Sequence, residues 1–414
     1  MAQSLACSSG QGSLDYHHAL TYLDSLELRG WKFGLGRTRA LLDALGSPDK
    51  QLAIVHVAGT NGKGSVCAML DAILQQAGYV VGRYTSPHLV RVTERFTING
   101  TEISETEFAR LVSCITPHVT DQTYFEVLTA IALLYFYQHK VDYAILEVGL
   151  GGRLDATNVV TPVVSVITTI SREHTDYLGT KLADIAREKA GIVKPGVPVV
   201  TGTRGTALSA IQRVCREQGS RLLVVPLSRK VETNLLGDFQ RKNAAVSEAA
   251  AEVLATQQHF TLPEATILEG LQHVTWPGRL EFVGRNVLLD CAHNPAAMEA
   301  LAGFVMSLSF PKIITVFGVL RDKDYRTMLR RVNTFSDALI ITKVPVERGL
   351  DAAATAAVAR KIGAQPIIKE NVADAVSAAR SLAGSSGLVL ITGSCYLVGA
   401  VKDLLARYGS SAYS

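Results

Sequence analysis

Short runs of apolar, often β-branched residues recur along the chain, and segments with helical periodicity separate them. The runs are LAIVHVA (52–58), YAILEVG (143–149), VVSVITTI (163–170), RLLVVP (221–226), NVLLDCA (286–292), KIITVFGV (312–319), ALIITKV (338–344) and LVLITGS (388–394). Continuous apolar runs without polar alternation are typical of parallel strands that are covered on both faces. Their alternation with helices predicts an α/β fold.

Two helices can be predicted closely from the spacing of apolar positions. The helix after the first run has one apolar stripe, formed by Val66, Met69, Leu70, Ile73, Leu74 and Ala77. Gly78 is its expected end, because glycine readily adopts the left-handed conformation found there. The segment VLTAIALLYFY at 127–137 predicts a buried core helix, since it is too short to span a bilayer.

A break in the pattern near residue 275 predicts two domains. A long helical stretch (243–258) and a polar connection precede it, and Pro277-Gly278 interrupts regular structure. A new set of apolar runs begins afterwards. We therefore expect a larger domain at 1–275 and a smaller α/β domain at 276–414, which is reasonable for 414 residues.

Composition narrows the class of protein. Hydrophobic residues make up 48% of the chain, enough for large cores, and the formal net charge is only +4. That surplus gives no reason to expect nucleic acid as a partner, so basic residues would act locally on a small anion. The N-terminus is polar and lacks the apolar core of a signal peptide, and no segment predicts a membrane span. We expect a cytoplasmic protein with free thiols, because the six cysteines are scattered without CxxC spacing.

The strongest motif is VHVAGTNGKGSVCAML at 55–70, in which a buried strand leads through a glycine-rich loop into a helix. Such a loop can wrap phosphate oxygens with backbone N–H groups, and the helix N-terminus adds partial positive charge. Lys63 can reach the β- and γ-phosphates, and Ser65 can face Mg²⁺.

The loop departs from the pattern GxxxxGK[ST] at two positions. Val57 replaces the first glycine, and Gly64 separates Lys63 from Ser65. This departure points away from GTPases and kinases. The alternative is a glycine turn with an incidental lysine.

The loop GTNGKGS resembles that of the Mur ligase superfamily, in the branch of dihydrofolate synthase and folylpolyglutamate synthase. Other segments agree in order along nearly the whole chain: TSPHL (85–89), TYFEVLT (123–129), LEVGLGGRLDATN (146–158), SREHTDYLG (171–179), REKAGI (187–192), GDFQRKNAA (237–245), WPGRLE (276–281), LLDCAHNP (288–295) and GSCYLVG (393–399). The resemblance implies a P-loop ATP-binding domain with a mostly parallel sheet and a smaller Rossmann-like glutamate-ligase domain. It also implies ATP-driven amide formation through an acyl phosphate.

The resemblance assigns a metal and catalytic set. Glu147 ends an apolar strand, where a carboxylate suits Mg²⁺, although it could also be a surface glutamate. Ser86 and His174 join it as implied metal ligands, with two Mg²⁺ sites expected. Histidine is a poor first choice for Mg²⁺, and Glu173 stands where a related pattern has aspartate. Lys189 corresponds to the family's carbamylated lysine, whereas an isolated lysine is more often a surface residue. Lys63, Lys189 and His174 are the implied catalytic residues.

The resemblance also implies two sets of binding residues. The ATP set is Gly59, Thr60, Asn61, Gly62, Lys63, Gly64, Ser65, Asn243, Arg279, Asp290 and His293. The set for a pterin and benzoate substrate is Lys32, Phe33, Gly34, Thr123, Tyr124, Phe125, Glu126, Leu154, Asp155 and Ala156. Aromatic residues suit a flat heterocycle, but they could equally pack the core. The run from Asp290 to Asn294 could also be a polar turn that caps a helix beginning at Pro295.

The leading hypothesis is a monomeric ligase that adds L-glutamate both to 7,8-dihydropteroate and to reduced folates, without nucleic-acid or membrane partners. One alternative is a polyglutamylating enzyme alone. Another is a muramyl peptide ligase, although only about 55 residues precede the loop, few for the extra domain that such enzymes carry. A third alternative is an ATP-binding regulatory protein, against which the metal set and Lys189 argue.

Overall fold

The computed structural model describes residues 14–30 and 32–408. The described chain forms two compact units. The first comprises the residues up to Ser86, Val92–Asn234 and Arg241–Val274. The second comprises Pro87–Arg91, Leu235–Gln240 and the residues from Thr275 onward. A single cut of the chain at 275/276 does not include the two short segments, 87–91 and 235–240, that group with the second unit. The domain boundary at 275/276 therefore stays a prediction.

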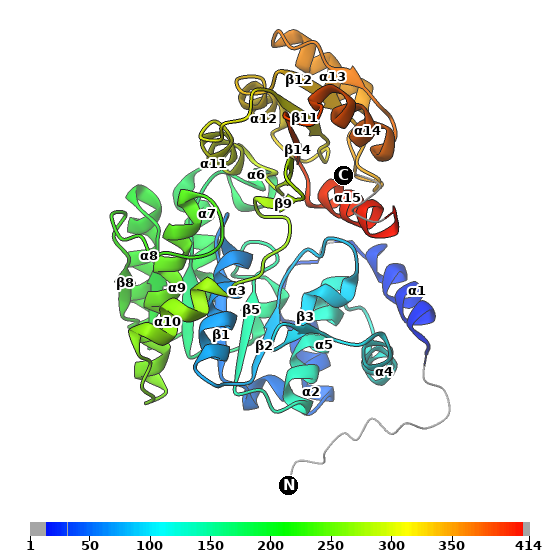
Figure 1. Ribbon diagram of the computed structural model, residues 1–414. Helices are drawn as coiled ribbons and strands as arrows, with labels where there is room; N and C mark the ends of the chain where they lie inside the picture. The colour runs from blue at the N-terminus through cyan, green and yellow to red at the C-terminus, as the bar shows by residue number, and fades with distance from the viewer. Residues whose placement is uncertain (1–13, 31, 409–414) are drawn as a thin grey trace. The chain divides into compact units, whose positions relative to one another are not determined.

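The first unit is built on an eight-stranded sheet with the order β4-β3-β2-β5-β1-β6-β7-β8. Its strands are β1 (Ile54–Ala58), β2 (Val81–Tyr84), β3 (Phe96–Ile98), β4 (Thr101–Glu102), β5 (Tyr143–Glu147), β6 (Val164–Ile167), β7 (Val199–Thr201) and β8 (Leu222–Val224). Strands β2, β5, β1, β6, β7 and β8, in this spatial order, are parallel, and β3 and β4 add an antiparallel edge beside β2. Figure 1 shows β2, β5 and β1 as neighbours within this unit.

The helices of the first unit surround this sheet or pack on one another. They are α1 (Tyr16–Glu27), α2 (Gly36–Ala44), α3 (Lys63–Gln76), α4 (Glu105–Ile115), α5 (Tyr124–Gln138), α6 (Thr175–Leu178), α7 (Leu182–Lys189), α8 (Gly205–Glu217), α9 (Asp238–Gln257) and α10 (Glu264–Gln272). The first residues of α9 (238–240) are grouped with the second unit. The predicted core helix lies within α5, whose residues from Glu126 to Phe136 are all buried. Its apolar side chains fill the core beside α1, α2 and α4.

The predicted helix after the first strand is α3, and Gly78 follows its end with φ 88°. More of α3 is buried than the expected single apolar stripe, because Cys67 and Ala68 on other sides of the helix are also buried. Helix α10 covers α3 there, and a Cβ at Gly270 would come within 2.7 Å of the Ile73 Cα. Such close backbone approach requires glycine.

The second unit has a six-stranded sheet with the order β13-β12-β11-β14-β10-β9. Its strands are β9 (Glu281–Val283), β10 (Val287–Leu289), β11 (Ile313–Phe317), β12 (Ala338–Ile341), β13 (Ile367–Ile368) and β14 (Leu388–Thr392). Among these six described strands, β9 pairs with β10 in antiparallel orientation and the other neighbours are parallel. Its helices are α11 (Pro295–Val305), α12 (Tyr325–Val332), α13 (Ala352–Lys361), α14 (Val372–Ala383) and α15 (Cys395–Tyr408). The predicted α/β fold with mostly parallel sheets is confirmed.

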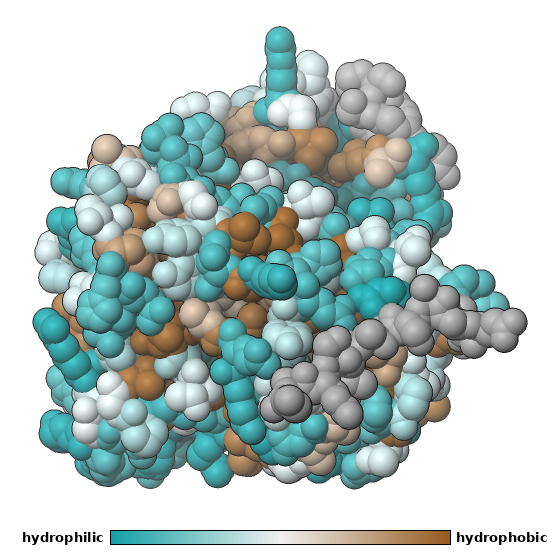
Figure 2. All heavy atoms as spheres, turned by 90° about the horizontal axis from the view of Figure 1, so that it is seen from below, coloured by the Kyte–Doolittle hydropathy of each residue, from teal (hydrophilic) through white to brown (hydrophobic). Residues whose placement is uncertain are grey.

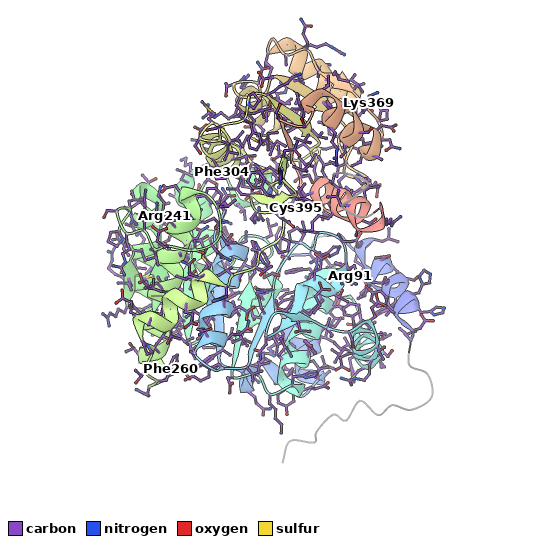
Figure 3. The ribbon with its side chains drawn as sticks, viewed as in Figure 1. Arg91, Arg241, Phe260, Phe304, Lys369 and Cys395 are labelled. Carbon is purple, nitrogen blue, oxygen red and sulfur yellow. The ribbon has the colours of Figure 1, made fainter. Side chains whose placement is uncertain are left out.

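The cysteines follow the prediction in part. Cys67, Cys215, Cys291 and Cys395 are buried free thiols, the last at the start of α15 (Figure 3). Cys114 is disulfide-bonded, so the prediction of a free thiol is wrong there. Pairing depends on proximity in the fold, which spacing along the chain does not reveal. Cys7 lies outside the described residues.

Across residues 14–30 and 32–408, no helix is both long enough and apolar enough to traverse a bilayer. Hydrophilic side chains cover most of the face shown in Figure 2, with separate apolar patches between them. This distribution is ordinary for a protein whose apolar residues mainly build its cores.

Candidate active site

The glycine-rich loop between β1 and α3 has two glycines that no other residue could replace without strain. Gly59 has φ 149° and Gly62 has φ 87°. A Cβ at Gly59 would lie 1.9 Å from the Thr168 Oγ1, and one at Gly62 would lie 2.5 Å from the Asn243 Oδ1. The loop therefore packs tightly between the end of β6 and α9, with Asn243 against Gly62, while the role of Asn243 in ATP binding stays a prediction.

Hydrogen bonds from the end of β6 fix the shape of this loop. The Thr60 N–H donates to the Thr169 carbonyl at 2.7 Å, and the Thr168 hydroxyl donates to the Asn61 carbonyl at 2.7 Å. Gly64 and Ser65 lie in the first turn of α3, where backbone N–H groups have no partner within the helix. The arrangement can bind an anion, because those groups and the helix dipole meet at one point.

Lys63 and Glu147 lie together beside the loop. The Lys63 Nζ donates to the Thr60 carbonyl at 3.2 Å and lies 3.9 Å from the Glu147 Oε1. Glu147 ends β5, only 4% exposed, and its Oε2 accepts the Ser86 N–H at 3.1 Å. The structure thus brings together three predicted residues from three segments at the carboxyl end of the parallel strands.

His174 is the third implied metal ligand. It precedes the short helix α6 with a left-handed φ of 50°, and its Nε2 lies 3.7 Å from the Glu173 Oε1. Among the described residues, no group of three or more His, Cys, Asp or Glu side chains forms a metal-binding arrangement. A shared site for Ser86, Glu147 and His174 therefore stays a prediction.

Lys189 is a buried lysine at the end of α7. It is 4% exposed, and its Nζ donates to the Gly59 carbonyl at 2.8 Å, so the amine touches the start of the phosphate loop. Burial lowers the pKa of Lys189 to about 7, and the nearby Lys63 cation contributes to the shift. Glu173 and Asp155 oppose it. The surface-lysine alternative does not hold for this side chain.

Arg37 bridges two of the predicted folate-binding segments. Lys32, Phe33 and Gly34 lie between α1 and α2, and the Lys32 carbonyl accepts the Arg37 Nη2 at 2.7 Å. Arg37 also pairs with Glu126 at 2.9 Å. Arg37 was missed from the sequence, because nothing local marks an arginine that bridges two distant segments.

Thr123 and Glu126 have a clear structural role. The Thr123 hydroxyl accepts the Glu126 N–H, and the Glu126 carboxylate accepts the Thr123 N–H at 2.7 Å, which forms the capping box of α5. Tyr124 lies 5.8 Å from Arg95 in a cation–π arrangement. Phe125 packs against Gly149, where an added Cβ would lie 2.5 Å from its ring. Phe125 also stacks on Tyr84 and packs against the core, which confirms the core-packing interpretation, while substrate binding by Phe125 stays a prediction.

The LDA segment follows β5. Asp155 is buried, and its Oδ2 accepts the Leu150 N–H at 2.9 Å, while its Oδ1 accepts the Thr157 N–H at 3.0 Å. Ala156 begins a buried turn of 3₁₀ helix, and Leu154 is half-buried beside it. The 149–157 loop thus folds around the carboxylate of Asp155.

Three predicted ATP residues belong to the second unit. Asp290 follows β10 and accepts the N–H groups of Leu280 and Ala292 at 3.1 and 2.9 Å. Burial raises its pKa to about 6, against the opposing effect of the Arg279 cation. The His293 Nδ1 lies 2.9 Å from the Cys291 carbonyl. Asn294 caps α11 by accepting the Ala297 N–H, with Pro295 in the first turn, which confirms the predicted capping turn.

Comparison with known proteins gives one consistent result. Residues 57–199 match the Mur ligase middle domain, and residues 278–395 match the Mur ligase glutamate ligase domain. The dihydrofolate synthase/folylpolyglutamate synthase of Bacillus subtilis is 37% identical over 94% of this chain and 99% of its own.

Solved structures agree with the sequence comparison. A Mycobacterium tuberculosis folylpolyglutamate synthase complexed with ADP and AMPPCP superposes with a TM-score of 0.88 at 32% identity, over 95% of this chain and 99% of that one. An Escherichia coli FolC in complex with DHPP and ADP has the same TM-score at 33% identity, over 97% and 100% of the two chains. The chain therefore belongs to the dihydrofolate synthase/folylpolyglutamate synthase family of Mur ligases.

Proposed function

We propose that this chain is an ATP-dependent ligase that joins L-glutamate to 7,8-dihydropteroate and to reduced folates. The acceptor carboxylate attacks the γ-phosphorus of ATP, ADP leaves, and an acyl phosphate forms. The glutamate amine then attacks the acyl carbon, and phosphate leaves as the amide forms. The observation that supports this function most is that Lys63, Glu147 and Lys189 meet around one glycine-rich loop.

In this proposal the loop amides and Lys63 hold the ATP phosphates. Phosphoryl transfer depends mainly on positioning and on neutralising charge. The Lys63 ammonium lies within reach of both the loop and Glu147, so it can follow negative charge as it moves to the leaving ADP. The reported complexes of related enzymes with ADP and AMPPCP support ATP as the nucleotide.

The residues around Glu147 fit a magnesium site. Mg²⁺ is usually held by one or two carboxylates together with nucleotide phosphates, so a cluster of three protein ligands is not required. Glu147 supplies a buried carboxylate, and Ser86 beside it supplies a hydroxyl. When bound, Mg²⁺ would offset the repulsion between the triphosphate and the attacking carboxylate. A second Mg²⁺ and a ligand role for His174 also belong to the proposal.

Lys189 is proposed to carry a carbamate. CO₂ reacts only with a neutral amine, and a pKa of about 7 leaves about half of the Lys189 amines neutral at pH 7. The carbamate would replace a buried cation with an anion near Lys63, where it could support the second metal or the acyl phosphate.

We expect ¹³C-labelled bicarbonate to give a carbamate signal in the wild-type NMR spectrum. The signal and the activity should both fall as the pH drops below about 7, because protonation removes the reactive amine. Lys189→Arg should lose both. Lys194→Arg is the matched control, since Lys194 is a part-buried lysine whose pKa is also lowered by burial, and it should keep the signal. Full activity in CO₂-free buffer, where no carbamate signal is present, would remove the carbamate from the mechanism.

Arg37 bonds to both Lys32 and Glu126, and the Phe125 ring packs against Gly149, which supports one acceptor subsite for both folate substrates. Phosphate release should require glutamate and should occur with either 7,8-dihydropteroate or a reduced folate. Turnover with the reduced folate alone would leave a polyglutamylating enzyme. Turnover with neither would contradict the proposed function.

Further assignments are made by family resemblance. Asn243, Arg279, Asp290 and His293 are proposed to contact ATP. The protein is proposed to be a cytoplasmic monomer that acts on small molecules.

A further inference from the structure

A chain of buried hydrogen bonds links the first strand to the proposed folate subsite. His56 lies in the middle of β1 and is fully buried, and its Nε2 is 2.8 Å from the Thr157 Oγ1. The Thr157 hydroxyl in turn donates to the Asp155 Oδ1 at 2.5 Å. All three side chains belong to the first unit.

The direction of each bond follows from the number of available hydrogens. A threonine hydroxyl has one hydrogen, and here the carboxylate of Asp155 takes it. The Thr157 oxygen must therefore accept a hydrogen from the His56 Nε2. This fixes the imidazole as the Nε2–H tautomer, with Nδ1 as a bare acceptor. Burial lowers the pKa of His56 to about 3, with help from the Lys194 cation, so the ring stays neutral at physiological pH.

The two ring nitrogens of His56 differ, because within the described part of the chain Nε2 is hydrogen-bonded and Nδ1 is not. The His56 Nδ1 is buried and has no hydrogen-bond partner among the residues that the structure describes. A buried acceptor without a hydrogen bond is energetically unfavourable. Packing alone therefore does not explain a histidine in β1. Among the described residues, the bond to Thr157 is the polar contact that accounts for it.

Asp155 connects the His56–Thr157 pair to the rest of the 149–157 loop. Its two oxygens accept the N–H groups of Leu150 and Thr157, which lie near the two ends of the 149–157 loop. The Thr157 hydroxyl adds a third bond from the loop to the same carboxylate. His56 connects these hydrogen bonds to β1, and the phosphate loop begins three residues after His56.

We propose that His56 and Thr157 are positioning residues of the folate subsite. Through Asp155 they hold the 149–157 loop in the shape that receives the acceptor substrate, in fixed relation to the phosphate loop. This inference rests on the proposed function. It assigns these two residues to binding of the folate-type acid and not to binding of ATP.

The kinetic test compares Thr157→Val, which removes the hydroxyl at nearly constant volume, with Thr157→Ser, which keeps it. We expect Thr157→Val to raise the KM for 7,8-dihydropteroate by about tenfold, as for loss of a hydrogen bond to a charged group. The KM for ATP should change by less than about twofold. Thr157→Ser should restore the wild-type KM, which a purely space-filling role would not require.

Thr315→Val is the matched control, because Thr315 is a fully buried strand threonine in the second unit whose hydroxyl bonds to that of Ser336. It should leave the KM for 7,8-dihydropteroate unchanged. An unaltered KM in Thr157→Val, or equal rises in KM for ATP and dihydropteroate, would overturn the inference. Absence of turnover in the wild type would instead refute the proposed function.

A second measurement does not depend on enzyme activity. Nitrogen-15 NMR of the wild-type histidine rings should show one imidazole as the neutral Nε2–H tautomer, unchanged between pH 6 and pH 8, and His56→Gln should remove that signal. Assignment of the His56 signal to the Nδ1–H tautomer, or its titration near neutral pH, would disprove the hydrogen-bond chain.

Discussion

Replacement of Lys63 by alanine is expected to lower ATP turnover by on the order of a thousandfold, because it removes the side-chain cation beside the phosphate loop at the moment when charge moves onto ADP. The fold should survive, since the ammonium makes one backbone hydrogen bond and one ion pair at 3.9 Å, and no apolar core depends on it. Steady-state phosphate release and a thermal unfolding curve check the two expectations together.

Lys50→Ala is the matched control for Lys63→Ala. Lys50 is an exposed lysine of the first unit that lies 3.9 Å from Asp43 in a surface ion pair, so its loss should change neither rate nor stability appreciably. A Lys63→Ala enzyme with the wild-type rate would overturn the assignment of the phosphate site. Loss of rate together with loss of cooperative unfolding would show a structural role instead.

Replacement of Glu147 by glutamine is expected to raise the Mg²⁺ concentration needed for half-maximal turnover by at least about tenfold. Glutamine keeps the side-chain length and a carbonyl oxygen that can accept the Ser86 N–H, so the main change is the loss of negative charge. Turnover titrated with Mg²⁺ at saturating ATP measures the effect.

Glu107→Gln serves as its control, because Glu107 is a part-buried glutamate whose carboxylate is paired with Arg110 on α4. It should leave the Mg²⁺ titration unchanged. An identical titration for Glu147→Gln and the wild type would remove Glu147 from the metal site.

Local patterns predicted the elements that position the phosphate loop. The strand, loop and helix from 54 to 76 are legible because apolar periodicity and glycine chemistry both act over a few residues. The core helix α5 was equally clear, but its start at Tyr124 depends on the capping box of Thr123 and Glu126, which were interpreted only as substrate contacts. The two roles are compatible, since a cap also fixes the position of its side chains.

Several features could not be predicted because they depend on contacts between distant segments. The run containing β2 is short and includes Gly82 and Arg83, so it did not appear as a strand, although it pairs with β5 inside the sheet. The inclusion of 87–91 in the second unit is likewise invisible in chain order. His56 looks like one polar residue within an apolar strand until the fold brings Thr157 beside it.

The most direct test of the proposed chemistry is the fate of oxygen in the acceptor carboxylate. The enzyme would be given 7,8-dihydropteroate labelled with oxygen-18 in both carboxylate oxygens, with ATP, Mg²⁺ and L-glutamate, and the products would be analysed by mass spectrometry. An acyl phosphate keeps one carboxylate oxygen as the bridge to phosphorus, and that oxygen leaves with phosphate when the amine attacks carbon. The account predicts one labelled oxygen in each phosphate released and one in the new amide. Amide formation with unlabelled phosphate would contradict it, and label in AMP would indicate transfer of an adenylyl group instead.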